Sequence, residues 1–371
     1  VLGATAVNFD FSDESKALGD QARKLLAERA GTGPARKAMA DGAPAMDAAL
    51  WKDIAELGWT AARVPEAHGG LDLSVEEVAQ LAEAAGGSLA HVPLVSTLLA
   101  TEALLLAGSE AQQAKWLPGI ASGATIAVVA WNEPGAITPA TVKTRSAGGM
   151  LTGVKQPVAD LGLAHMAIVA AAGPDGPQLY IVDLAGADVA SVETVDLVRR
   201  HGKLTLNNTP GEALGTADDY QNWLDRAAII LAYEAIGTAG AAMAMSVEYA
   251  KTRVAFGQKI GRYQSVKHKC ADMYIKLELA RAHALHGVAM IGMNGPELRQ
   301  AAAAARVASL DALGFCAEEN VQLHGGIGFT WESDCQFYYR RGRTAVAALG
   351  PRGWWADRLV RALEQRNRAA A

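Results

Sequence analysis

The sequence contains little cysteine. Its 371 residues include three cysteines, Cys270, Cys316 and Cys335, and none of them has C-x-x-C spacing. A small, odd number of widely spaced cysteines argues against a disulfide framework and against a zinc site. His268 and His324 have no second ligand at metal-binding spacing, so we expect no metal. This cysteine usage is typical of a reducing compartment, and we expect a cytoplasmic protein.

Long apolar runs and blocks of one charge are also absent. The longest apolar runs, such as 126–130 and 227–231, are far shorter than the roughly 20 residues of a membrane span. The first seven residues lack the basic flank of a signal peptide. The 34 basic and 39 acidic residues are interleaved and give a net charge of −5. We therefore expect neither a membrane span nor nucleic-acid binding.

Three zones of different texture follow one another along the chain, as expected for a length that favours two or three domains. Residues 1–122 read as helical, with Ser12 before Asp13 and Glu14 as a helix start. Residues 123–220 contain short β-prone runs between glycine and proline turns. Residues 221–371 carry long apolar stripes at spacings of three and four, and the stripe of Trp355, Leu359 and Leu363 marks the predicted fourth helix of the bundle. The predicted fold is mostly α with a β insert: an N-terminal helical domain, a middle β-domain and a C-terminal four-helix bundle.

Two segments of the last zone are candidate ligand contacts. In the first, Arg253 precedes Phe256 and Gly257, and a cation, an aromatic ring and free amides suit a pyrophosphate and a ring system. In the second, Gln322 precedes three glycines within residues 325–328, which allow close backbone approach. Taken singly, the first is more typical of an ordinary turn with a solvated arginine. The second is equally typical of a helix end and does not match G-x-G-x-x-G.

Together these segments resemble the acyl-CoA dehydrogenase family. The resemblance rests on "RVAFGQKIG", "YQ", "VKH" and "ADM", on the later "QLHGGIGFTWE" and "YYRR", and on "LGW" and "PEAHGG" near residues 57–70. It covers the whole chain and implies the same three domains, FAD as cofactor and α,β-dehydrogenation of an acyl-CoA thioester. Typical relatives pass electrons to an electron-transfer flavoprotein. The residues that match FAD-contacting positions, toward FAD held mainly by a neighbouring subunit, are Arg253, Phe256, Gln322, Gly325 and Gly326.

The middle domain departs from the family pattern. Where the family usually reads T-E-P-G-x-G-S-D, this chain has N-E-P-G-A-I-T-P at residues 132–139, so that Glu133 survives and Gly-Ser-Asp does not. The family's W-I-T/S segment, which packs on the flavin ring, corresponds to Pro157-Val158-Ala159. The aromatic ring and the hydroxyl are both missing.

The usual catalytic position is altered as well. The family reaction needs a carboxylate whose pKa rises on desolvation, so that it can abstract the α-proton. The usual glutamate position corresponds to Leu349, and an alternative position on the first bundle helix corresponds to Ala227. Asp225 is a weak candidate and Glu234 lies nearly two turns later, so either would need a shifted helix register. Beside Arg226, Asp225 is more typical of a surface ion pair than of a base. The catalytic base is left unassigned.

These matches and departures lead to one hypothesis and two alternatives. The positions that reach a neighbour's FAD are present, whereas those that hold the chain's own FAD and substrate are eroded. We expect one subunit of a heteromeric α2β2 bacterial acyl-CoA dehydrogenase, a type that includes enzymes of steroid side-chain degradation, with a homologous partner that carries the base. The first alternative is a self-sufficient homotetrameric dehydrogenase or oxidase with a non-standard carboxylate. The second is a non-catalytic structural or regulatory subunit.

Overall fold

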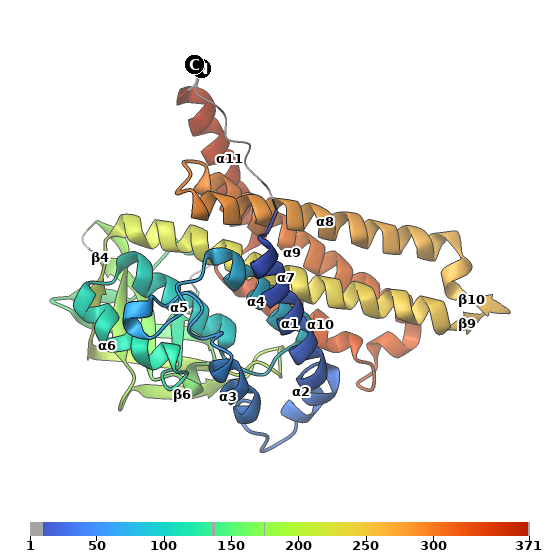
Figure 1. Ribbon diagram of the computed structural model, residues 1–371, viewed down its shortest axis with the longest axis horizontal. Coiled ribbons are helices and arrows are strands. Elements are labelled where there is room, and N and C mark those ends of the chain that lie inside the picture. Colours follow the sequence, from blue (N-terminus) through green and yellow to red (C-terminus); the bar gives the residue numbers. More distant parts are fainter. Residues whose placement is uncertain (1–9, 136–137, 174, 370–371) are drawn as a thin grey trace.

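The computed structural model describes residues 10–369 except 136–137 and 174. Helices at both ends of the sequence flank a β-sheet, in the predicted order (Figure 1). The Ser12 hydroxyl accepts a hydrogen bond from the Ser15 amide at 3.1 Å and caps the first helix where the sequence predicts its start. The N-terminal helices are α1 (Asp13–Arg29), α2 (Thr32–Ala38), α3 (Ala48–Glu56), α4 (Val75–Ser88), α5 (Leu94–Ala107) and α6 (Glu110–Ala121).

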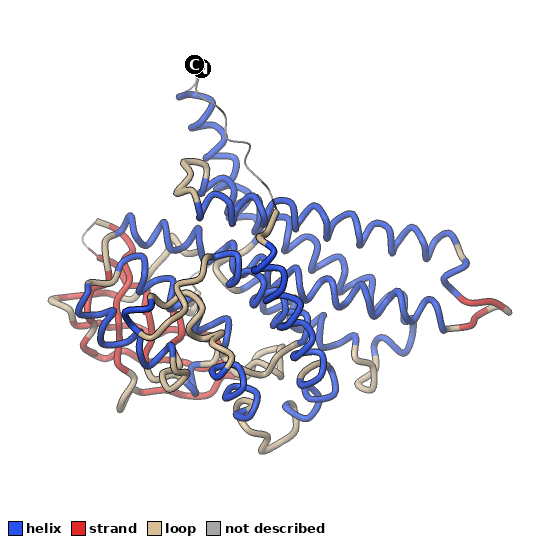
Figure 2. Tube along the Cα trace, viewed as in Figure 1, coloured by secondary structure: helices blue, strands red, loops and turns tan. Residues whose placement is uncertain are grey.

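The middle of the chain folds into one mixed sheet, which confirms the predicted β insert. Within the described residues this sheet has eight strands in the order β6-β7-β3-β2-β4-β5-β8, with β1 paired to β4. Strands β1 and β2 run parallel to β4, and the other pairs are antiparallel. Figure 2 shows these strands gathered at one end of the molecule. They are β1 (Ala127–Ala130), β2 (Arg145–Ala147), β3 (Met150–Ala159), β4 (Met166–Gly173), β5 (Gly176–Asp183), β6 (Asp188–Val192), β7 (His201–Pro210) and β8 (Glu212–Leu214).

The C-terminal region is a helical bundle, as predicted. Helices α7 (Ala217–Thr252), α8 (Gln264–Gly292) and α9 (Leu298–His324) pack on one another, and α10 (Cys335–Ala347) packs on α7 and α9. Helix α7 is long and apolar enough to cross a membrane, but 72% of its apolar window is buried inside the protein, as in the core helix of a soluble protein. Helix α11 (Arg352–Ala369) packs on α9 and projects from the body (Figure 1).

The fourth helix of the bundle differs from the predicted one. The sequence pattern assigns that place to the helix of Trp355 and Leu359, which is α11, whereas α10 occupies it. The buried face of α10 includes Arg341 and Gly342 beside Tyr338, so it has no continuous apolar stripe. Apolar periodicity therefore fails to indicate a helix whose inward face carries an arginine.

Glycines let the N-terminal region pack closely on α7. A Cβ at Gly237 would lie 1.9 Å from the Glu83 carbonyl oxygen, and a Cβ at Gly86 would lie 2.1 Å from the Glu234 carbonyl oxygen. Any side chain at either position would force the helices apart. This contact fixes the part of α7 from which the Glu234 side chain extends.

Candidate functional site

The segment that begins at Arg253 forms a hairpin at the far end of the bundle. Its strands β9 (Val254–Ala255) and β10 (Gln258–Lys259) are antiparallel and are joined by Phe256 and Gly257. Both turn residues have positive φ, 53° and 79°, as in a type I′ turn. A bulky residue adopts this conformation at a steric cost, yet Phe256 is 97% exposed. Arg253 is exposed beside it. An exposed aromatic held in a strained turn is typical of a functional contact.

The glycine segment follows the end of α9 and is also exposed. Gly325 begins the short turn η4 (Gly325–Phe329) with φ +62° and ψ −143°. Gln322, Gly325 and Gly326 are exposed, and Phe329 is 79% exposed. Among the described residues, no heavy atom lies within 4 Å of a Cβ built on either glycine. The backbone amides of this turn can therefore be approached closely from outside the chain.

An aromatic stack holds the two segments at the same end of the bundle. The rings of Tyr249, on the last turn of α7, and His324, at the end of α9, lie 4.0 Å apart between centroids. His324 Nδ1 lies 2.7 Å from the Asn320 carbonyl oxygen, and the Ser246 hydroxyl donates to Asn320 Oδ1 at 2.9 Å. The structure thus places the five sequence-predicted FAD-contacting residues at the same end of the bundle, and all five are exposed there.

The chain's own cavity lies farther back along α7, against residues 223–238 in the part of the helix nearer the sheet, between the sheet and the bundle. Its volume is about 110 Å³, well below the roughly 300–1,000 Å³ of pockets for drug-sized ligands. Pro157 and Ala159, which match the family's flavin-packing segment, form part of its wall, and so does Leu349. Other residues that line it are Val95, Ser96, Leu99, Val129, Trp131, Asn132, Arg199, His201, Trp223, Leu231, Glu234, Ala235, Thr238, Arg306, Leu313, Arg341, Thr344, Ala345, Ala347 and Ala348.

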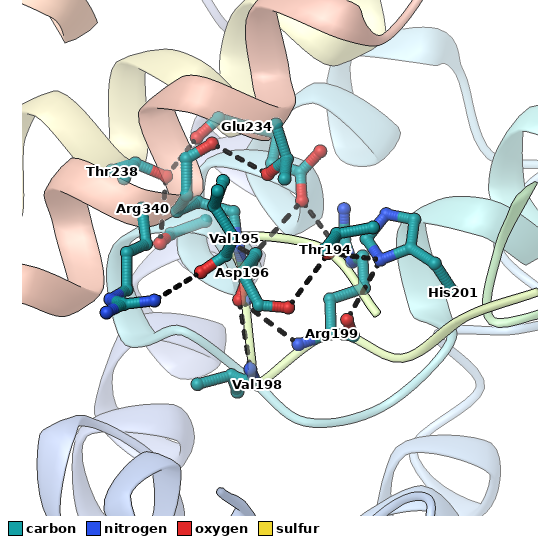
Figure 3. Close-up of polar contacts among 12 residues, drawn as sticks. Thr194, Val195, Asp196, Val198, Arg199, His201, Glu234, Thr238 and Arg340 are labelled. Carbon is teal, nitrogen blue, oxygen red and sulfur yellow. Dashed lines mark hydrogen bonds and ion pairs between the residues drawn. The ribbon is translucent and has the colours of Figure 1, made fainter. Parts of the chain in front are cut away.

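A buried ionic network stands at this cavity (Figure 3). The loop between β6 and β7 reaches the bundle, where Arg199 Nη2 lies 2.6 Å from Glu234 Oε1 and Asp196 pairs with Arg341 of α10. Burial alone would raise the pKa of Glu234, but Arg199 and Arg341 outweigh burial and hold this pKa below its usual value. Burial alone would also raise the pKa of Asp196, but the charges of Arg341 and Arg199 outweigh burial and hold this pKa below its usual value. Glu234 is therefore a paired carboxylate and is a poor proton acceptor.

The other candidate base positions offer no free carboxylate to the cavity. Leu349 lines the cavity but has no proton-accepting group. Ala227 is fully buried on α7. Asp225 does not line this cavity; it pairs with Arg358 of α11 at 2.7 Å. Burial raises the pKa of Asp225, although Arg358 opposes the shift.

Glu133, which this chain retains from the family pattern, has a structural role. Its carboxylate accepts hydrogen bonds from the Lys155 ammonium at 2.6 Å and from the Thr144 amide at 2.9 Å. Burial lowers the pKa of Lys155 to about 8, although Glu133 opposes this shift. The pair ties the loop after β1 to β3, which accounts for Glu133 without a ligand. Ile137, which stands in place of the glycine of the family's Gly-Ser-Asp, lies outside the described residues, as does Ala136 before it.

These two regions differ in how well they fit FAD. The wall at Pro157–Ala159 has no ring or hydroxyl for a flavin, and ion pairs stand at the small cavity beside it, so this chain's own cavity does not fit the flavin ring. The exposed face at Arg253 and Gly325 offers a cation and approachable amides, which fit a pyrophosphate.

The fold and the exposed glycine and arginine segments define a class of protein. Residues 12–124 match the model of the acyl-CoA dehydrogenase N-terminal domain, and residues 218–363 match that of the C-terminal domain. The chain belongs to the acyl-CoA dehydrogenase family, whose members are FAD-dependent flavoproteins.

Particular relatives cover nearly the whole chain. Acyl-CoA dehydrogenase IpdE2 of Mycolicibacterium smegmatis is 32% identical over 341 residues, which are 92% of this chain and 96% of that protein. The solved structure of a variant of the Tcur3481-Tcur3483 steroid ACAD is 29% identical, with a TM-score of 0.89 over 97% of this chain and 99% of that one. The ChsE4-ChsE5 complex from Mycobacterium tuberculosis shares the fold at 24% identity, with a TM-score of 0.88 over 96% of this chain and 99% of that chain.

Sequence reasoning missed the arginines at the cavity. Arg199, Arg306 and Arg341 line it, and Arg306 is 1% exposed. One signal was available: Arg306 interrupts an alanine-rich stretch on the buried side of α9. A charged residue within an apolar stripe is rarely buried unless it has a specific partner.

Proposed function

We propose that this chain is the FAD-completing subunit of a heteromeric acyl-CoA dehydrogenase. In this assembly a homologous partner holds most of the FAD, the acyl-CoA and the catalytic base. Arg253 contacts the pyrophosphate, Phe256 covers part of the cofactor, and the amides near Gly325 and Gly326 approach it. FAD, when bound, accepts the hydride in the α,β-dehydrogenation, and an electron-transfer flavoprotein in the cytoplasm takes up the electrons.

The observation that carries the proposal is the contrast between the two ends of α7. The exposed face has the strained Phe256 and an open glycine turn, whereas the cavity lacks a free carboxylate. A site built from two chains requires an oligomer. The names of the steroid ACAD and of the ChsE4-ChsE5 complex support a two-component assembly that acts on a steroid-derived acyl-CoA.

The self-sufficient alternative has less support. Glu234 is the one carboxylate among the described residues that line the cavity, and Arg199 holds it. A purely structural subunit is also less favoured, because it would have no use for an exposed aromatic in a strained turn.

The decisive experiment is a flavin spectrum and a native mass, for the chain alone and after co-expression with homologues encoded beside it. We expect a colourless chain that becomes yellow only with a partner, at about one FAD per two chains. If the chain alone binds one FAD per protomer and oxidises an acyl-CoA, the proposal is wrong. If no partner restores flavin binding, the structural alternative replaces it.

A further inference from the structure

We propose that the cavity between the sheet and the bundle binds a small carboxylate anion between Arg306 and Arg341. This inference goes beyond the FAD-completing role and does not depend on it, because the cavity borders residues 223–238 of α7 whereas the exposed hairpin follows the end of that helix at Thr252.

The first observation is an incompletely paired guanidinium. Arg341 is 3% exposed, and its Nε pairs with Asp196. Neither Nη1 nor Nη2 has a hydrogen-bond acceptor among the described residues. Nη1 lies 4.0 Å from Glu234 Oε1, which is beyond hydrogen-bond distance. Buried donors are nearly always satisfied, so an acceptor from outside the chain is expected here.

The second observation is a buried cation without a close counter-ion. Arg306 Nη2 donates to the carbonyl oxygens of Ala345 and Ala348, whereas Nε has no acceptor among the described residues. No carboxylate in the described part of the chain forms an ion pair with Arg306. Burial lowers its pKa to about 10, opposed by the charge of Glu234. A bound anion would supply the missing negative charge.

The nearby carboxylates are already engaged. Glu234 accepts from Arg199, and Asp196 accepts from Arg341 and from the Val198 amide at 3.0 Å. Figure 3 shows the contacts of Glu234 with Arg199 and of Asp196 with Val198. Several guanidinium donors at the cavity therefore have no acceptor in the described part of the chain. Two oxygens on one planar group suit a guanidinium.

The rest of the lining selects the kind of anion. Leu99, Val129, Trp131 and Leu313 add apolar surface, and the volume of about 110 Å³ accommodates several waters or a small organic anion. Apolar walls beside a charged end favour a short monocarboxylate over chloride or inorganic phosphate.

The test is a titration of the full chain with sodium butyrate, followed by thermal unfolding and by calorimetry at constant ionic strength. Acetate, chloride, inorganic phosphate and neutral 1-butanol serve as probes of charge and of tail. We expect butyrate to raise Tm with concentration, because a ligand of the native state stabilises it. Acetate should act more weakly, and chloride, phosphate and butanol should not raise Tm.

Variants separate this site from a general salt effect. Arg341→Met should weaken butyrate binding about tenfold or more, and Arg341→Lys should weaken it less, because a charge-assisted bidentate contact is lost. If Arg341→Met does not fold, Ala235→Leu fills the cavity while it leaves the arginines in place, and it should also abolish binding. Arg358→Lys, which alters a buried ion pair outside the cavity, is the control and should bind butyrate normally. Equal stabilisation by chloride, or unchanged binding by Ala235→Leu, would overturn the proposal.

Discussion

The hairpin end of helix α7 and the part of this helix nearer the sheet have different surroundings. They differ in how exposed the neighbouring charged residues are and in whether these residues form ion pairs. At the hairpin end, Arg253 and Phe256 extend into solvent. At the sheet end, Arg199, Arg341 and Glu234 are largely shielded from solvent. They form ion pairs with one another or with Asp196. Folding explains the second arrangement, in which each of these four residues is close to an opposite charge. It does not explain the first, in which an aromatic side chain gains nothing from the chain's own core.

Stability alone does not account for the buried network. Apolar residues of similar volume often replace a buried ion pair without loss of stability, so stability alone is a weak reason for three arginines at one cavity. The network instead places three arginines around a small cavity beside Pro157 and Ala159. The predicted FAD-contacting residues therefore face outward, whereas the cavity at the sheet is lined by buried arginines.

The largest expected effect comes from breaking the buried network at one partner. Asp196→Asn leaves Arg341 without its counter-charge, and we expect the free energy of unfolding to fall by about 3–5 kcal/mol. Urea unfolding measures this loss. Arg352→Ala, which breaks the exposed pair with Asp311, is the control and should cost less than about 1 kcal/mol. Similar losses of unfolding free energy in both variants would mean that the buried and the exposed ion pair contribute equally to stability.

The next effect concerns the exposed hairpin. Arg253→Glu with Phe256→Asp should lower the flavin content of the heteromeric enzyme about tenfold or more, because a charge-assisted contact and an aromatic contact are both lost. The Tm of the chain alone should not fall, since neither side chain is buried. Arg262→Glu reverses an exposed charge at the same end of the bundle and is the matched control. Equal flavin loss in the control would point to general repulsion instead of a specific contact.

The sequence alone nominated candidate residues in the outward-facing half of this comparison, and it missed the arginines of the inward-facing half. The predicted FAD contacts lie in local motifs, so Arg253 and Gly325 could be nominated from short segments, and their contact with FAD stays a prediction. The network joins a loop at Asp196 to helices at Glu234 and Arg341, and such long-range pairs leave no local pattern. A buried arginine also explains why α10 was not predicted. Arg341 faces inward and interrupts the apolar periodicity on which helix prediction depends.

A smaller effect is the pH dependence of the stability that Glu234 contributes. The pKa of Glu234 is held below its usual value of 4.5 in the folded chain. The unfolded state therefore takes up the proton first as pH falls, and the stability that Glu234 contributes is present above about pH 4.5 and lost below it. Urea unfolding between pH 7 and pH 3.5 should show wild type and Glu234→Gln converging in acid. A constant difference across that range would mean that Glu234 is not an ionised partner of Arg199.

The smallest expected effect is on catalysis by an Asp225 variant. Asp225 faces Arg358 of α11 and does not line the cavity, so it cannot reach a substrate bound there. Asp225→Asn should change kcat of the assembled enzyme by less than about twofold, whereas loss of a general base costs on the order of a hundredfold or more. It should lower the free energy of unfolding by about 1–3 kcal/mol, because Arg358 loses a charged hydrogen-bond partner. Steady-state kinetics and urea unfolding on the same variant separate these outcomes. A hundredfold fall in kcat with flavin retained would restore the self-sufficient enzyme and would make the contrast between the two ends of α7 incidental to function.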